Sequence, residues 1–183
     1  MDVLIFGAGS LGSLLGGLLA RTHDVTLVGR EPHVGTVRRD GLRITGVESL
    51  TVRPGATTDG AGLSADLALV TVKAYDTEAA ARTLASGDVD VVCSLQNGMG
   101  NEDVLAAHLD VPILAGTATY GARLAEPGHV EWLGRGRVTV GPWRPDDDVE
   151  TAERVAAAVR AAGLDAAVTN RTERIEQRLG GSV

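Results

Sequence analysis

The sequence of 183 residues has almost no lysine, because Lys73 is the only one among its 17 basic side chains. Aromatic residues make up only 3% of the chain, so the core must be built mainly from Val, Leu, Ala and Ile. Cys93 is the single cysteine, which excludes an internal disulfide and indicates a reducing compartment. Because it lies in an apolar run, we expect it to be a small buried hydrophobe.

Other absences narrow the class of protein. No run reaches the roughly 18 apolar residues of a membrane span, and the apolar stretch 12–20 has no basic leader, so we expect a cytoplasmic protein. A net charge of -7 argues against a nucleic-acid surface and against binding to anionic membranes. The four histidines are isolated and Ser10 lacks a G-x-S-x-G context, so we expect neither a metal site nor a serine hydrolase.

Strand-like and helix-like segments alternate over the first 120 residues. Continuous apolar runs predict buried strands, and leucines at helical spacing predict a helix after the first of them. Asp76 and Asn101 are the expected N-caps of two later helices. The expected strands are 2–6, 24–29, 66–72, 89–95 and 112–120, the expected helices are 10–21, 31–41, 76–86 and 101–109, and residues 42–54 are expected to form a hairpin.

After residue 120 the pattern changes. Antiparallel strands are expected at 128–134 and 137–142, a helix at 149–163, a strand at 164–169 and a helix from 170 to 179. Strands that are apolar on both faces and alternate with helices indicate a parallel sheet covered on both sides. The sequence therefore predicts an α/β fold: a Rossmann-like, doubly wound, mostly parallel sheet with helices on both faces and an antiparallel extension after residue 120.

The stretch GAGSLG (7–12) follows the first expected strand and opens a helix, within a β-α-β unit of about 30 residues. In this context Gly7 permits a tight turn, Gly9 lets the backbone approach a pyrophosphate, and Gly12 lets helix and strand pack closely. The helix N-terminus would supply N–H groups to the phosphates. The alternative is a glycine-rich turn that binds nothing.

The second expected strand ends in LVGR, where NAD-binding folds usually place an acidic residue for the ribose 2′-hydroxyl. Arg30 is a cation, which suits a 2′-phosphate and therefore NADP(H). Glu31 follows directly, and the alternative is a solvated surface arginine.

Lys73 comes just after the strand expected at 66–72, at the carboxyl edge where open α/β sheets bind ligands. The alternative is a surface lysine. Asn97, in SLQNGMG (94–100), offers an amide to a nicotinamide or a substrate oxygen, or is simply a turn residue. The small residues of GTATYGA (116–122) would let a flat ring lie against the backbone.

Four motifs, GAGSLG, VTVKAYD, QNGMG and GTATYGA, resemble those of the ketopantoate reductase (2-dehydropantoate 2-reductase) family in order and spacing. The resemblance implies an NADP(H)-binding Rossmann-type domain over 1–170 and the reduction of 2-dehydropantoate to pantoate, on the route to pantothenate and coenzyme A. It also implies contacts of Lys73 and Asn97 with both cofactor and keto acid. The cofactor residues it implies are Gly7, Ala8, Gly9, Ser10, Leu11, Gly12, Arg30, Lys73, Asn97 and Ala122. The family often has Gln at the place of Asp76.

The family continues into a helical substrate domain, and residues 171–183 look like a remnant of its first helix. Arg178 stands near the family's proton-donor lysine, and Ser182 near its first substrate-binding asparagine. Arginine does not readily give up a proton, since its pKa lies above about 12. The resemblance therefore implies weak or no turnover by this chain, and we assign no catalytic residue.

Two alternatives stay open. One is a non-catalytic dinucleotide-binding or sensing module that needs a partner chain, and the other is a different 2-oxo or 3-hydroxy acid dehydrogenase. We also expect a homo-oligomer that associates through the face near residues 120–183, since a missing docking domain would expose apolar surface.

Overall fold

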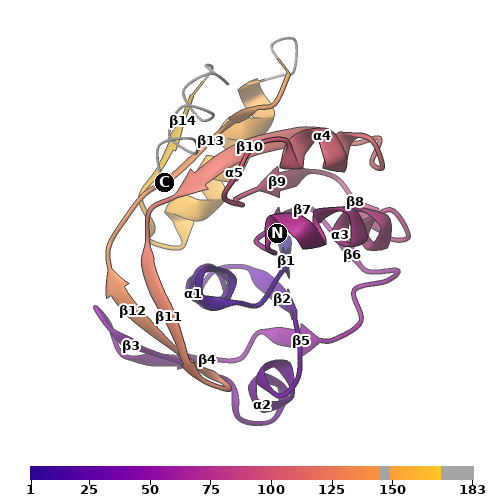
Figure 1. Ribbon diagram of the computed structural model, residues 1–183. Helices are drawn as coiled ribbons and strands as arrows, with labels where there is room; N and C mark the ends of the chain where they lie inside the picture. The colour runs from indigo at the N-terminus through magenta and orange to yellow at the C-terminus, as the bar shows by residue number, and fades with distance from the viewer. Residues whose placement is uncertain (145–148, 170–183) are drawn as a thin grey trace.

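The computed structural model describes residues 1–144 and 149–169. Their largest element is an eight-stranded sheet with the strand order β14-β13-β10-β9-β7-β1-β2-β5 (Figure 1). Its strands are β1 (Asp2–Phe6), β2 (Asp24–Val28), β5 (Gly55–Thr57), β7 (Leu67–Val70), β9 (Val92–Ser94), β10 (Ile113–Ala118), β13 (Val138–Pro142) and β14 (Ala166–Val168).

The strands from β10 to β5 are all parallel, whereas β13 runs antiparallel to β10 and carries β14 parallel to itself. From β1 the chain moves outward to β2 and β5, and it then returns to β7 on the other side of β1. The sheet therefore has a topological switch point between β1 and β7. This confirms the predicted doubly wound, mostly parallel α/β fold.

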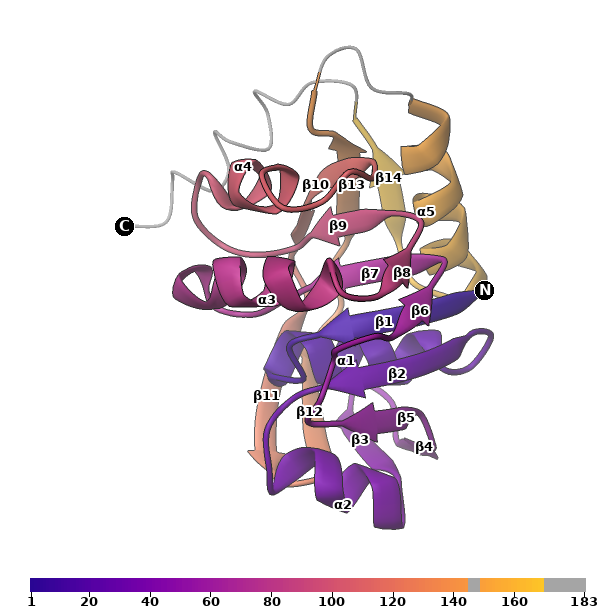
Figure 2. The same cartoon turned by 90° about the vertical axis from the view of Figure 1, so that its right-hand side faces the viewer.

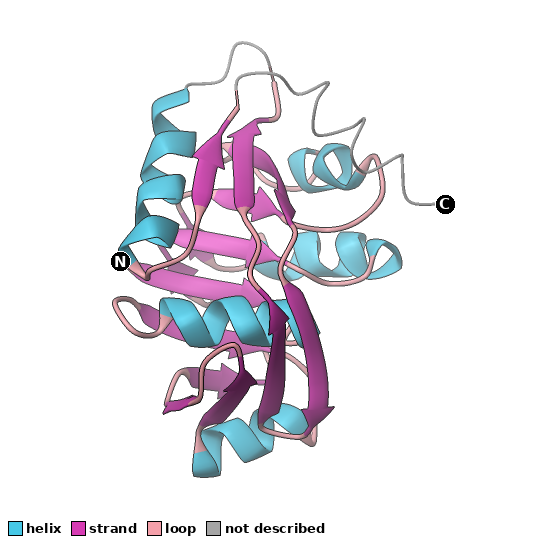
Figure 3. Cartoon of the chain, turned by 90° about the vertical axis from the view of Figure 1, so that its left-hand side faces the viewer, coloured by secondary structure: helices cyan, strands magenta, loops and turns pink. Residues whose placement is uncertain are grey.

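Helices cover both faces of this sheet (Figures 2 and 3). In β1, Val3 and Ile5 belong to the core on the α1 and α5 side, while Leu4 and Phe6 belong to the core under α3 and α4. The strand is thus buried on both faces, as its unbroken apolar run predicts. The helices are α1 (Ser10–Leu19), α2 (His33–Asp40), α3 (Thr77–Leu84, preceded by the 3-10 turn η1, Ala74–Asp76), α4 (Asn101–Ala106) and α5 (Val149–Ala161).

A second sheet lies on the outer side of α1 (Figure 3). It has the order β11-β12-β3-β4 and consists of β11 (Gly121–Glu126), β12 (His129–Gly134), β3 (Leu42–Gly46) and β4 (Leu50–Val52). Helix α1 is therefore enclosed between two sheets, and its residues from Gly12 to Leu19 are all buried. Two short strands, β6 (Ser64–Ala65) and β8 (Asp88–Val89), form a separate parallel pair.

Glycines make the double packing of α1 possible. A Cβ atom at Gly16 would lie 2.8 Å from a side-chain atom of Ile5 in the large sheet. A Cβ atom at Gly17 would lie 2.8 Å from side-chain atoms of both Ile44 and Leu42 in the second sheet. Adjacent glycines thus let the helix approach both sheets more closely than larger residues would allow.

Several local expectations are corrected by long-range contacts. The segments at 128–134 and 137–142 are strands with antiparallel partners, but β12 pairs with β11 and β13 pairs with β10. The expected hairpin over 42–54 is present as β3 and β4. Two strands were not predicted: β5, which has only three residues and pairs with the distant β2, and β11, whose residues are half-buried or exposed and show no apolar run. The expected helix at 170–179 and the remnant at 171–183 lie outside the described residues.

Of the two expected N-caps, Asp76 occupies the predicted position and Asn101 does not. Asp76 stands at the N-cap of α3, yet among the described residues its side chain makes no cap hydrogen bond and accepts one from Arg30 instead. Asn101 is the first residue of α4 and not its cap, because Gly100 occupies the N-cap with a φ of +83°. The Asn101 side chain reaches back to the Asn97 and Gly98 carbonyls at 3.3 Å.

Cys93 is fully buried in β9, as expected for a small core residue, and burial raises the pKa of its thiol. No helix within 1–144 or 149–169 has both the length and the apolar character to cross a membrane.

His33 joins three separate parts of the fold from the first turn of α2. Gly128 in the β11–β12 turn donates its N–H to His33 Nδ1 at 3.0 Å, so Nδ1 must carry a lone pair. The proton of the neutral ring is then on Nε2, which lies 2.9 Å from Ser13 Oγ in α1. The ring is buried, and this burial lowers the pKa of His33.

We expect Gly12→Ala to destabilise the fold, because a Cβ atom at this position would overlap the Gly7 carbonyl oxygen and crowd Thr71 Oγ1. Overpacking of this kind typically costs about 1–3 kcal/mol. Gly9→Ala in the same loop is the matched control, since no described atom lies within 4 Å of its added Cβ. Urea denaturation of both variants is the measurement, and equal free energies of unfolding would contradict the packing argument.

We also expect His33 to make stability depend on pH. Well above pH 6.5, the ordinary pKa of histidine, the imidazole is neutral in both states, and its effect on stability does not vary with pH. Below that value the unfolded chain binds a proton that the folded chain, with its lowered pKa, binds less readily. The free energy of unfolding therefore falls as the pH falls. Urea denaturation between about pH 7 and pH 5 should show a smaller loss in His33→Gln than in the unchanged protein, and parallel losses would contradict it.

Candidate cofactor site

A cleft lies at the carboxyl ends of β1, β2 and β7, next to the switch point of the large sheet. It has a volume of about 650 Å³. Its walls are the segments that follow these three strands, the inner side of α3 and the turn between β11 and β12. Ligands of doubly wound sheets bind at such a position, because the neighbouring crossovers depart to opposite faces of the sheet and leave a crevice.

The glycine loop forms the floor of this cleft through Gly7, Ala8 and Gly9. Gly7 has a φ of +122°, and the N–H groups of Gly7 and Ala8 both donate to the Val28 carbonyl, at 3.0 and 2.9 Å. Thr71 Oγ1 donates to the Gly7 carbonyl at 2.7 Å. These hydrogen bonds attach the loop to the segments on both sides of β1. They hold its backbone in a conformation in which a ligand can approach it closely.

The other three loop residues have internal contacts. Ser10 Oγ accepts a hydrogen bond from the Leu124 N–H at 3.0 Å, which joins the loop to β11. Leu11 packs against the core, and Gly12 lies against the Gly7 carbonyl. The N-cap of α1 is Gly9, which has no side chain to cap the helix. The first-turn N–H groups thus remain available, with the positive end of the helix dipole, for a phosphate.

Arg30 and Asp76 line the cleft from different elements. Arg30 follows β2, and its Nη2 atom lies 3.1 Å from Oδ2 of Asp76 in the η1 turn. Glu31 also lines the cleft, but its carboxylate accepts hydrogen bonds from Arg38 at 2.7 Å and from the Gly35 N–H at 3.0 Å. Sequence reasoning found Arg30 but missed this pairing with Asp76.

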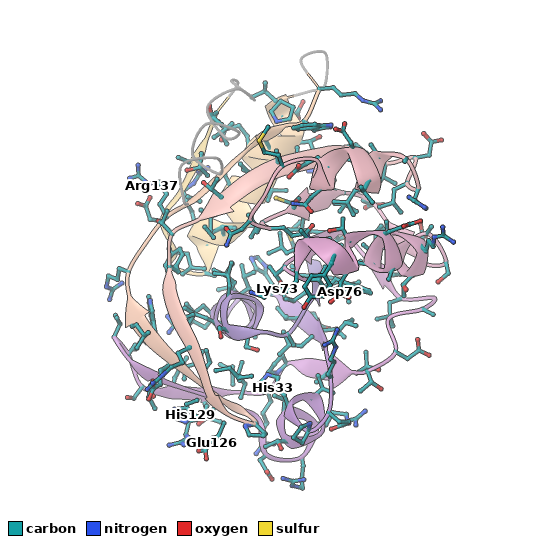
Figure 4. All side chains as sticks on the ribbon, in the orientation of Figure 1. His33, Lys73, Asp76, Glu126, His129 and Arg137 are labelled. Carbon is teal, nitrogen blue, oxygen red and sulfur yellow. The ribbon has the colours of Figure 1, made fainter. Side chains whose placement is uncertain are left out.

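Lys73 is exposed and lines the same cleft beside Asp76 (Figure 4). Its carbonyl accepts a hydrogen bond from the Asp76 N–H at 2.8 Å, which closes the η1 turn. Tyr75, in the same turn, is 81% exposed and also lines the cleft. The single lysine and an aromatic ring thus stand at the cleft, although only the lysine was singled out from the sequence.

Asn97 and Ala122 are not among the described residues that line this cleft. Asn97 is exposed in the loop between β9 and α4, and Ala122 is half-buried in β11 against the core. The structure therefore brings together Gly7–Gly9, Arg30 and Lys73, and leaves Asn97 and Ala122 outside the lining of this cleft. Arg178 and Ser182 lie outside the described residues.

A buried polar network links the lysine turn to the Asn97 turn. Gln96 Nε2 donates to the Val72 carbonyl at 3.0 Å and to Thr77 Oγ1 at 2.7 Å. Thr77 donates to Asn101 Oδ1 at 3.0 Å, and the Asn101 amide in turn reaches the Asn97 carbonyl. Polar residues directly after buried strands were the sequence signal that could have identified this network.

These features suit a dinucleotide. The rigid glycine loop and the open helix N-terminus fit a pyrophosphate, and Arg30 stands at the end of β2, where the adenosine ribose of such ligands is bound. Within the described part of the chain no group of three or more His, Cys, Asp or Glu side chains could hold a metal ion.

Comparisons with known proteins agree with this geometry. The family model described as ketopantoate reductase PanE/ApbA matches residues 3–145. The 2-dehydropantoate 2-reductase of Halobacterium salinarum is 44% identical over 181 residues, covering 95% of this chain and 59% of the relative. The enzyme of the same name from Archaeoglobus fulgidus is 42% identical over 172 residues, covering 93% of this chain and 57% of the relative.

Solved structures similar to this chain include a ketopantoate reductase and a dehydrogenase with a bound nicotinamide cofactor. The PanE/ApbA family ketopantoate reductase of Ralstonia eutropha has a TM-score of 0.83 and 35% identity, covering 92% of this chain and 56% of that protein. D-mandelate dehydrogenase, solved with NADH and anilino(oxo)acetate, has a TM-score of 0.88 and 25% identity, covering 97% and 60%.

This chain spans less than two thirds of the length of each of these relatives. The family model nevertheless matches well over half of it, including the glycine loop, Arg30 and Lys73. The chain therefore belongs to the PanE/ApbA ketopantoate reductase family.

Proposed function

We propose that this chain binds NADP(H) in the cleft beside β1 and supplies the cofactor-binding half of a 2-dehydropantoate 2-reductase. The observation that carries the proposal is that Gly7–Gly9, Arg30 and Lys73, which come from three separate strand ends, line one cleft. The names of the relatives support the substrate, and the NADH in the D-mandelate dehydrogenase structure supports a nicotinamide cofactor.

Each residue has a proposed task. The N–H groups at the start of α1 bind the pyrophosphate, and Arg30 binds the 2′-phosphate. Lys73 provides a positive charge for the anionic cofactor and keto acid, and Asn97 orients the substrate oxygen from the neighbouring turn. Ala122 contributes to the wall of the site through β11. The bound cofactor supplies the hydride, and a ketone reduction also requires a proton donor near the developing alkoxide.

We do not assign the proton donor to Lys73. The family resemblance gives that role to a lysine in a segment corresponding to 171–183, where this chain has Arg178. Residues 1–170 are accordingly proposed to be the nucleotide-binding domain, and 171–183 the start of a substrate domain. The family places this activity in pantothenate synthesis, and the single cysteine favours the cytoplasm. Self-association through residues 120–183 stays a prediction.

Two other functions were open from the sequence. A sensing module without catalysis is not favoured, because the relatives reported above are named as reductases and dehydrogenases. A dehydrogenase for another 2-oxo acid has some support in the TM-score of 0.88 to D-mandelate dehydrogenase. The 44% identity to a 2-dehydropantoate 2-reductase makes dehydropantoate the better proposal.

Binding titrations of NADPH and NADH test the cofactor proposal. We expect the chain to prefer NADPH, and Arg30→Ala to weaken NADPH binding by about tenfold while changing NADH binding much less, since only NADPH carries the 2′-phosphate. Arg53→Ala is the control, because Arg53 is an arginine outside the residues that line the cleft. Equal affinity for both cofactors in the unchanged protein would remove the 2′-phosphate assignment.

A turnover assay tests whether the cofactor-binding half can catalyse the reduction by itself. With NADPH and 2-dehydropantoate, we expect this chain alone to oxidise the cofactor weakly or not at all, because no proton donor is assigned in its described part. The absorbance of NADPH follows the reaction, and a relative of full length serves as the positive control. Rapid turnover by the chain alone would show that the cofactor half contains its own general acid.

A further inference from the structure

An ion pair spans the wall of the cleft where the adenosine end of the cofactor is proposed to bind. Arg30 follows β2 and Asp76 follows β7, so the two residues are 46 positions apart in the sequence. Their side chains meet with Nη2 and Oδ2 at 3.1 Å, and both line the cleft. The residue proposed to bind the 2′-phosphate therefore already has an anionic partner.

Stability does not account for this pair. The Arg30 side chain is 83% exposed and the Asp76 side chain 33% exposed, and ion pairs at exposed positions contribute little to folding. Asp76 also makes no cap hydrogen bond to α3 within the described residues, although it stands at the N-cap. Its carboxylate is directed instead at a guanidinium that a ligand would need.

The other acidic groups at the cleft are engaged elsewhere. Glu31 is bound by Arg38, and Glu126, in the β11–β12 turn, is bound by Arg43 at 2.8 Å. Of the acidic side chains that line the cleft, Asp76 is the one that pairs with Arg30. Lys73 lies on the same η1 side of the cleft as Asp76 (Figure 4).

We propose that Asp76 sets the cofactor selectivity of this chain by competing with the adenosine 2′-phosphate for Arg30. The inference rests on the proposed NADP(H) site. NADPH must displace the Asp76 carboxylate from Arg30 and bring its phosphate close to a like charge, which opposes binding. NADH has no phosphate at this position and leaves the pair intact.

The Asp76 carboxylate also favours NADH directly, as a hydrogen-bond acceptor. Folds that select NAD use an acidic side chain to accept a hydrogen bond from the ribose 2′-hydroxyl, usually from the end of the second strand. Here the acidic residue is Asp76, which comes from the segment after β7 and pairs with Arg30 at the end of the second strand. The site thus combines an NADP-type cation with an NAD-type anion, and its preference for NADPH is smaller than Arg30 alone would give.

The test is a titration of NADPH and NADH against the unchanged chain, Asp76→Asn and Glu78→Gln. Asp76→Asn should strengthen NADPH binding by roughly 3- to 10-fold and leave NADH binding unchanged or weaker. Glu78→Gln is the matched control, because it removes a carboxylate two positions away that pairs with Arg82 at 2.6 Å outside the cleft. The same gain in Glu78→Gln would mean a general charge effect and would overturn the inference.

A double variant separates competition for Arg30 from simple repulsion. In an Arg30→Ala background, Asp76→Asn should give a clearly smaller gain in NADPH affinity, because no guanidinium is left to release. An equal gain there would overturn the competition. Circular dichroism checks that each variant is folded, and Asp76→Ser should change the affinity in the same direction as Asp76→Asn.

The outcomes also distinguish this inference from the proposed function. If the unchanged chain binds neither cofactor, the proposed function fails and the inference fails with it. If both cofactors bind and the ratio of their dissociation constants is the same in Asp76→Asn, only the role of Asp76 is overturned.

Discussion

The contact between the start of α1 and the loop before it determines most of this architecture. The Gly7 carbonyl lies between Gly12 and Thr71, accepts the threonine hydroxyl at 2.7 Å, and leaves no room for a Cβ atom on Gly12. Because of this contact, the helix begins directly above the carboxyl end of β1. The same constraint therefore fixes the turn, the direction of α1 and the position of its free N–H groups, from which the cofactor cleft is built.

The second sheet is part of the same arrangement and not an appendage. It covers the outer side of α1, where Gly17 faces Ile44 and Leu42, and it sends the β11–β12 turn to the rim of the cleft. The Ser10 hydroxyl is bound to β11, and the His33 ring is bound to both Ser13 and Gly128. The loop, the helix and the second sheet thus hold one another in place around the site.

Sequence patterns predicted the features that depend on residues close together in the sequence. The apolar run of β1, the leucines of α1 and the glycine spacing identified the β-α-β unit and the cleft that it creates. The patterns did not identify β11, whose residues are half-buried or exposed and whose position depends on pairing with β12. They also could not show that Asp76 is near Arg30, because no local periodicity connects residues on different strands.

The pairing of β12 with β3 has a consequence for how the chain acquires its structure. It joins Arg43 to His129, which are 86 positions apart, although β3 is made early in the sequence. During synthesis the part of α1 that packs against β11 and β12, and the edge of β3 that pairs with β12, therefore stay uncovered until the β11–β12 hairpin has left the ribosome. Contacts of this span slow folding and leave apolar surface open to aggregation in the meantime. Formation of the β11–β12 hairpin is thus the step that closes this apolar surface.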